Sequence, residues 1–137
     1  MSQENVEAFK RAIEAFNLGD VEAALEDIHP EVEWHPVLQA SVAGSAVYRG
    51  HDGVREMWRD THQAFDIHAG YPEIRDLGDC LVALDHVRAI GRGSGAVTES
   101  PLCYVVEFRD AKGVRIRGYL DPAEALEAAE IPEERGP

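Results

Sequence analysis

Cysteine is scarce in this sequence of 137 residues, which contains only Cys80 and Cys103. Two cysteines cannot form the disulfide framework that holds many small secreted proteins together, and neither belongs to a CxxC pair. We therefore expect two free, buried thiols in a reducing compartment. The first residues, MSQENVEAFK, lack the basic and apolar regions of a secretory signal, so we expect a cytoplasmic protein.

Basic residues are also few: 13 lysines and arginines stand against 26 aspartates and glutamates, for a net charge of -13. A chain this acidic has little with which to neutralise nucleic-acid phosphates or an anionic membrane surface, so we expect neither partner. No apolar run reaches the length of a membrane span. The remaining composition, 45% hydrophobic and 28% charged, is that of a globular domain.

Motifs for metals and phosphates are missing as well. The six histidines show no HxH, HxxxH or HExxH spacing, and no cluster resembles a zinc site. The GRGSG segment lacks the strand, loop and helix context of a phosphate-binding loop, so it is interpreted as a β-turn. We expect no metal and no cofactor.

Apolar residues at helical spacing predict three helices in the first half of the chain. The first ends at Gly19, the second runs from Asp20 to Pro30 and buries Ile28, and the third begins between Gly50 and Asp52 and includes Phe65. A short strand covers 32–34, and the loop over 37–50 has the length of a lid or binding loop.

The second half of the chain alternates between strands and turns. We predict extended chain over 67–75 and long strands over 80–92, 97–109 and 114–120. Asp121 and Glu124 form a capping box that opens a last helix through Ala129. The prediction is one α+β domain over residues 1–130, with helices packed on a mostly antiparallel sheet, followed by a polar tail over 131–137.

The order of six segments resembles the SnoaL-like proteins of the nuclear transport factor 2-like superfamily. The segments are AFNLGD, EVEWHP, YRGHDGVREMW, DLGD, GRGSG and RIRGYLDPAEAL, and the resemblance extends from Asn5 to Ala129. It implies a cone in which a strongly bent sheet wraps three helices around a deep apolar pocket. Relatives include ketosteroid isomerase, limonene epoxide hydrolase, polyketide cyclases and pocket proteins without known activity, so the fold alone does not give the function.

Strand alternation predicts which side chains face this pocket. If Arg88 and Arg92 face water, then Asp85 points inward as the one charged residue on an apolar face. On the next strand the same argument places Tyr104 inside, and His62 joins both from the third helix. We expect the apolar wall to comprise Phe9, Phe16, Trp34, Trp58, Phe65, Leu102 and Gly118.

Asp85 is the first candidate for a general base. Burial raises the pKa of a carboxyl group unless it is paired, and a poorly hydrated carboxylate is a good base for a carbon-bound proton. Tyr104 would donate to an oxyanion, and His62 would orient groups or carry a proton. Two alternatives remain open: a register slip that turns Asp85 outward and His86 inward, and a structural pair of Asp85 with His62 or Tyr104.

The resemblance adds a second candidate base, and it also shows that some catalytic residues of the relatives have no counterpart in this sequence. In the isomerase relatives the base precedes a proline at the end of a strand, and here that position holds His35; a hydrogen-bonded strand-end histidine is the alternative. The isomerase tyrosine position holds Ala12 and its aspartic acid position falls at Tyr104. The epoxide hydrolase aspartate position holds Gly118, and Asp121, at a position credited with acid–base work in cyclases, fits a helix cap better.

Two functions follow from these residues. The first is cofactor-free acid–base catalysis on a small apolar or aromatic molecule, of the isomerase, cyclase or ring-opening eliminase type. The second is a non-catalytic module that binds a small metabolite. The resemblance also implies a homodimer through the outer sheet face, where charged and apolar side chains mix. That face comprises Arg75, Arg88, Glu107, Arg109, Arg115, Arg117, Val105, Cys103 and Tyr119.

Overall fold

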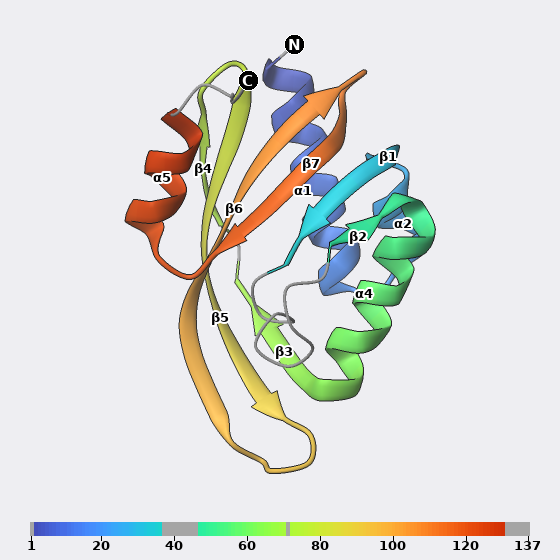
Figure 1. Ribbon diagram of the computed structural model, residues 1–137, viewed down its shortest axis with the longest axis vertical. Coiled ribbons are helices and arrows are strands. Elements are labelled where there is room, and N and C mark those ends of the chain that lie inside the picture. The colour runs from blue at the N-terminus through green and yellow to red at the C-terminus, as the bar shows by residue number, and fades with distance from the viewer. Residues whose placement is uncertain (1, 37–46, 71, 131–137) are drawn as a thin grey trace.

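The computed structural model describes residues 2–36, 47–70 and 72–130. Most of the loop predicted over 37–50 and the whole tail over 131–137 lie outside these ranges. The described chain forms a curled sheet that wraps around helices on its concave side, with a short helix on its outer side (Figure 1). This is the predicted α+β cone, and the fold prediction is confirmed.

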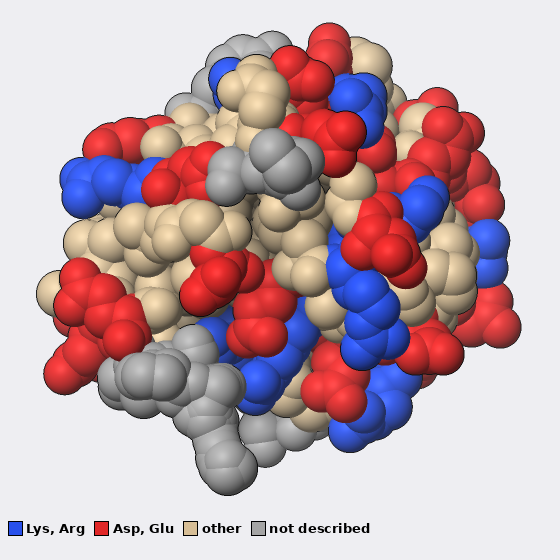
Figure 2. Space-filling model, turned by 90° about the horizontal axis from the view of Figure 1, so that it is seen from above, with Lys and Arg blue, Asp and Glu red and all other residues tan. Residues whose placement is uncertain are grey.

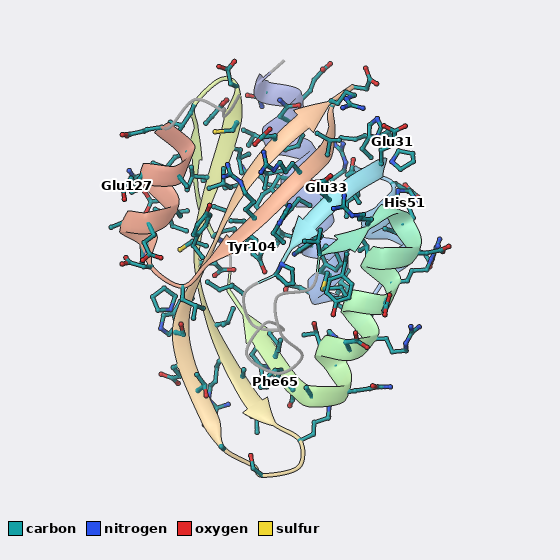
Figure 3. All side chains as sticks on the ribbon, viewed as in Figure 1. Glu31, Glu33, His51, Phe65, Tyr104 and Glu127 are labelled. Atoms are coloured by element: carbon teal, nitrogen blue, oxygen red, sulfur yellow. The ribbon has the colours of Figure 1, made fainter. Side chains whose placement is uncertain are left out.

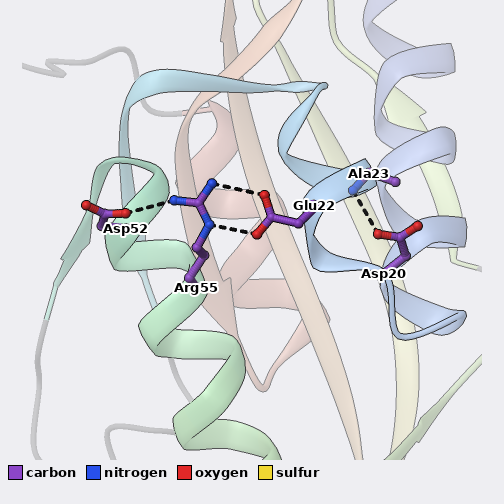
Figure 4. A network of polar contacts seen from close by, with 5 residues as sticks. All are labelled: Asp20, Glu22, Ala23, Asp52 and Arg55. Atoms are coloured by element: carbon purple, nitrogen blue, oxygen red, sulfur yellow. Dashed lines mark hydrogen bonds and ion pairs between the residues drawn. The ribbon is translucent and has the colours of Figure 1, made fainter.

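The first helix and a very short second one lie at the amino end. Helix α1 spans Ser2–Asn17 and α2 spans Val21–Leu25. Gly19, with a positive φ of 80°, ends α1 in the left-handed conformation that glycine adopts without strain. The Asp20 carboxylate then caps α2 by accepting a hydrogen bond from the Ala23 N–H at 3.0 Å (Figure 4).

The second helix is tied to the next one by an exposed ion-pair network. Helix α4 spans Gly50–Ala64 and carries Arg55, whose guanidinium donates two hydrogen bonds to Glu22 of α2, at 2.7 and 3.0 Å. A third bond of 2.7 Å joins Arg55 to Asp52 (Figure 4). The pKa of Glu22 is lowered mainly by its hydrogen bond from Arg55. The planar guanidinium therefore aligns two helices that share few direct contacts.

The second helix is shorter than predicted, because it does not reach Ile28. Strand β1 spans Ile28–His35, and Ile28 pairs with Gly113 in a parallel ladder. Pro30 falls within β1, where the register shifts between Ile28 and Glu33, because a proline cannot donate to a regular ladder. The helical pattern of Val21, Ala24 and Leu25 thus stops one turn earlier than its apolar spacing suggests.

Within the described ranges the sheet has seven strands, in the order β2-β1-β7-β6-β5-β3, with β4 also paired to β5. The remaining strands are β2 (Tyr48–Arg49), β3 (Phe65–Ala69), β4 (Glu73–Asp76), β5 (Cys80–Gly91), β6 (Val97–Arg109) and β7 (Lys112–Tyr119). Only the β1–β7 pair is parallel among these pairings. The extended segment predicted over 67–75 is therefore two strands, both paired to β5.

The last helix lies on the outer face of the sheet. Helix α5 spans Pro122–Glu130, and Asp121 caps it by accepting from the Ala123 N–H at 2.9 Å. Ala125 and Ala129 pack against an apolar patch of β5 and β6. That patch includes Cys80 and Cys103, which are both buried and neither of which forms a disulfide. The chain therefore covers part of its own outer face.

Candidate functional site

A cavity of about 490 Å³ lies between the concave face of the sheet and helices α1 and α4. Its size suits a small organic ligand. The apolar part of its wall comes mainly from alternate residues of β6 and from one face of each helix. These wall residues include Phe9, Ile13, Phe16, Trp34, Met57, Trp58, Ile67, Val87, Leu102, Val106, Phe108 and Ile116.

Asp85 is half-buried in this wall, on the inward face of β5. It pairs across to Leu102, another wall residue, so the inward register is the one that the structure adopts. The strand beside Asp85 is interrupted. β3 ends opposite Val87 and β4 begins opposite Leu84, so Asp85 faces the break between these two strands. One carboxylate oxygen accepts from the His86 N–H at 2.7 Å.

The charge state of Asp85 reflects two opposing effects. Desolvation by burial raises the pKa of the Asp85 carboxyl, and hydrogen bonds from the backbone N–H groups of His86 and Gly70 oppose that rise. The sequence suggested His62 or Tyr104 as the partner, whereas the structure supplies backbone donors. Only the strand break brings Gly70 to this carboxylate, and no sequence pattern signals it.

Tyr104 lies on the same face of the neighbouring strand. It pairs with Ala83 of β5, which places it diagonally from Asp85, at a separation of about 7–8 Å between Cα positions. Burial and the nearby Asp85 charge raise the pKa of the Tyr104 hydroxyl, so it stays protonated and can donate. Within the described ranges, no hydrogen bond uses this hydroxyl. Figure 3 shows Tyr104 at the middle of the sheet.

His62 reaches the cavity from the last turn of α4. Its Nδ1 lies 3.0 Å from the carbonyl oxygen of Trp58, which can only accept, so Nδ1 carries a proton. In the neutral ring, Nε2 is then the unprotonated acceptor. The imidazole also lies on the Trp58 indole, with ring centroids 4.0 Å apart. The helix therefore fixes both the orientation and the tautomer of His62.

Aromatic rings form the wall beside these polar groups. Phe16 of α1 stacks on Trp58 with centroids 5.0 Å apart, and meets Trp34 edge-on at 5.9 Å. Trp34 in turn contacts Tyr104 edge-on at 6.1 Å. The rings come from α1, α4, β1 and β6, so packing of distant segments builds the wall.

His35 does not share the cavity with Asp85, Tyr104 and His62. Trp34 points inward opposite Ile116, so its neighbour His35 lies on the outer face, opposite Arg117. There the His35 Nε2 atom lies 3.5 Å from the Glu33 carboxylate. The sequence could not settle this orientation, because His35 ends its strand and the alternation over 32–34 is short.

Two predicted wall residues are also absent from the cavity wall, and Gly113 was missed. Phe65 opens β3 directly after α4 ends, so it lies outside the helix that was predicted to include it, and Gly118 pairs with Tyr104; neither residue lines the cavity. Gly113 lines it, although strand alternation from Ile116 would turn Val114 inward and Gly113 outward. The reason is a bulge: Glu107 pairs with Arg115 and Phe108 with Gly113, so Val114 is the extra residue.

Two other kinds of feature, a metal centre and a membrane-spanning helix, are not found among the described residues. No group of three or more histidine, cysteine, aspartate or glutamate side chains in these ranges is placed to hold a metal ion. None of the described helices is long and apolar enough to cross a bilayer. On the surface seen in Figure 2, acidic side chains are widespread and basic ones lie among them.

The chain belongs to the SnoaL-like family: the model of the SnoaL-like domain matches residues 9–116. An NTF2-like protein of unknown function from Burkholderia pseudomallei is similar in structure, with a TM-score of 0.78 at 22% identity over 93% of this chain and 98% of that one. TerC, crystallised with polyporic acid, has a TM-score of 0.76 at 23% identity, over 93% and 99%.

A third similar structure is a polyketide cyclase, described as putative, from Xanthomonas campestris. Its TM-score is 0.73 at 17% identity, over 93% of this chain and 98% of that one. These identities show a shared NTF2-like fold and do not transfer an activity. No protein of curated function shows significant sequence similarity to the chain.

Proposed function

We propose that this SnoaL-like protein binds a small, largely apolar organic molecule in the cavity and abstracts a proton from one of its carbon atoms, with Asp85 as the base. The observation that supports this most directly is the convergence of Asp85, Tyr104 and His62 on one apolar-walled cavity. In the described part of the chain, no hydrogen bond joins any two of the three. Each is therefore available to a ligand rather than satisfied by the others.

The three groups match the needs of enolate chemistry. The Asp85 carboxylate takes a proton from a carbon next to a carbonyl group, forming its O–H bond while the C–H bond breaks. The C–H electron pair moves into the carbonyl, whose oxygen gains negative charge. The Tyr104 hydroxyl donates to that oxygen, and its raised pKa keeps the proton on the tyrosine until it is needed. His62 carries a proton through Nε2.

The relatives support a ring-containing ligand. TerC is described in complex with polyporic acid, and another similar structure is described as a putative polyketide cyclase. The aromatic wall of Phe16, Trp34 and Trp58 suits flat rings of this kind. We therefore place the reaction among isomerisations, cyclisations and ring-opening eliminations.

A benzisoxazole substrate tests the proposal, because its ring opening needs only a base, an apolar slot and a donor. The base removes the carbon-bound proton, the N–O bond breaks, and a nitrile and a phenolate form. Asp85→Asn keeps the side-chain shape and removes the base, so turnover should fall by orders of magnitude. His35→Ala, on the outer face, should retain it. Unchanged turnover in Asp85→Asn would rule out this base.

One observation favours the alternative, a binding module without chemistry. The Asp85 carboxylate accepts backbone hydrogen bonds at the break between β3 and β4, which is also what a purely structural aspartate would do. In that case Asp85→Asn would lower stability or ligand affinity, and wild-type turnover would not exceed that of acetate in water. The ring-opening rate of the wild-type protein therefore separates the two functions.

We also propose that the protein is a homodimer through the uncovered part of its outer face. Helix α5 covers Cys103 and Val105, so the apolar share of that face is smaller than the sequence suggested. What remains is a charged strip in which Arg117 and Arg115 lie 3.5 and 3.8 Å from Glu107. Charged side chains mixed with apolar ones in this way suit a two-fold interface between identical copies.

A further inference from the structure

We propose that the ligand is elongated, with a hydroxyl-bearing ring at the Asp85 end of the cavity and an apolar tail that ends at Gly113, which sets the tail length. This inference rests on the proposed function only in taking the cavity as the ligand site. It adds a substrate class and a residue that determines specificity.

The length of the cavity follows from the strand that lines it. Leu102, Tyr104, Val106 and Phe108 of β6 all contribute to its wall, in strict alternation. The last of these lies six positions after the first, which in an extended strand is about 20 Å. The cavity is therefore a long slot that follows β6, rather than a compact chamber around Asp85.

The two ends of the slot differ in chemistry. At the Leu102 end lies the acceptor group of Asp85, which pairs with Leu102 and is diagonal to the Tyr104 donor, and His62 lines the same cavity. A hydroxyl group on a ring both donates and accepts, so it can satisfy the carboxylate and the tyrosine together. Along Val106 and Ile116 toward Phe108 the wall is apolar, which suits a hydrocarbon tail.

The far end holds one carboxylate, and it already has a partner. Asp27 lines the cavity there, but its two oxygens accept from Arg11 at 2.8 and 3.3 Å. Its side chain is only 14% exposed. Because the pair is complete, this end makes no demand for a polar ligand group.

Gly113 closes the slot at that end, and its missing side chain leaves space. A Cβ atom at position 113 would lie 3.5 Å from Val106 Cγ1 and 3.7 Å from Ile116 Cδ1. These are ordinary contacts, and the φ of Gly113 is not in the left-handed region. The backbone thus accepts a Cβ atom, and a longer side chain that extends from it would shorten the slot.

A series of phenols from 4-methylphenol to 4-octylphenol, titrated by calorimetry, tests this inference. In the wild-type protein each added methylene should tighten Kd about fourfold, the gain expected from burying one CH₂, until the tail reaches Gly113. Beyond that length Kd should stop improving. The corresponding methyl ethers, which cannot donate, should bind more weakly at every length.

In Gly113→Val, Kd should stop improving at a shorter tail length than in the wild type. The Kd of the short phenols should be unchanged, and that of the long ones should rise tenfold or more. Gly113→Ala, whose added atom meets only ordinary contacts, should give a smaller shift in the same direction and keeps the test valid if valine disturbs the fold. Gly93→Val is the matched control, because nothing lies within 4 Å of its Cβ position and its backbone also avoids positive φ.

The outcomes separate this inference from the proposed chemistry. A wild-type series without length dependence, no binding of any phenol, or a Gly113→Val series parallel to the wild type would overturn the assignment of the tail site. Equal binding of phenols and methyl ethers would overturn the head-group assignment. Benzisoxazole turnover tests only the role of Asp85 as the base. If that role is disproved, the dependence of Kd on tail length can still hold, and if Kd does not depend on tail length, Asp85 can still be the base.

Discussion

His62 donates its Nδ1 proton to the carbonyl oxygen of Trp58, one helical turn earlier, while its ring lies on the Trp58 indole at 4.0 Å. The hydrogen bond and the stacking hold the ring in one orientation. They also select the neutral tautomer in which Nε2 has the free lone pair, because a carbonyl oxygen cannot donate. A proton carrier needs such a fixed acceptor.

We therefore predict that neutral His62 is protonated on Nδ1. Nitrogen-15 NMR of the imidazole at alkaline pH should show Nε2 as the unprotonated nitrogen. His62→Gln should lower benzisoxazole turnover less than Asp85→Asn does, since it removes the carrier and keeps the base. A spectrum with the proton on Nε2 would contradict the hydrogen bond to Trp58, and the assignment of the carrier would then fail.

The raised pKa of Asp85 predicts a pH-dependent stability. Because burial raises the pKa above its unfolded value, the contribution of this group is fully present below the unfolded pKa and is lost as the pH rises through the folded pKa. Asp85→Asn cannot ionise and avoids that loss. Between the unfolded and the folded pKa of Asp85, the free energy of unfolding of the variant should therefore rise relative to that of the wild type. Urea denaturation at a series of pH values measures both.

The matched control for this substitution is Asp79→Asn, at an exposed position just before the same strand. The free energy of unfolding of Asp85→Asn minus that of the wild type should have its lowest value at the acidic end of the pH series and rise from there. If the difference were constant with pH, or if it fell as the pH rose, the direction assigned to the pKa shift would be wrong.

Asp121 should act as a helix cap. Asp121→Ala removes the acceptor of the Ala123 N–H and should lower the free energy of unfolding by about 1 kcal/mol. Since α5 covers Cys80 and Cys103, the same variant should also speed their reaction with a thiol reagent. Asp121→Asn keeps an acceptor and should restore both. Unchanged stability with lost turnover would indicate the acid–base role instead.

Dimerisation should depend on the charged strip of the outer face. Sedimentation at micromolar concentration should give twice the mass of the chain. Arg117→Glu places a second acid beside Glu107 and should shift the protein toward monomer, more so at low salt. Arg59→Glu, on the exposed side of α4, makes the same charge change elsewhere and should leave the mass unchanged. A wild-type monomer would overturn the proposal.

The sequence by itself determined the orientation of the long strands. β5 and β6 each extend over more than ten residues, so alternation predicted an inward Asp85 and an inward Tyr104, with a register slip as the alternative, and both side chains line the cavity. The caps at Asp20 and Asp121 and the glycine end of α1 were equally readable, because each depends on residues only a few positions apart.

Tertiary structure alone decided the features that depend on pairing between distant segments. The parallel ladder with β7 draws Ile28 out of a helix and turns His35 outward, and a bulge opposite Phe108 selects Gly113 over Val114. The break between β3 and β4 brings the Gly70 N–H to Asp85. Local periodicity carries no record of such long-range register, because it is set by which strands meet and where their hydrogen bonds start.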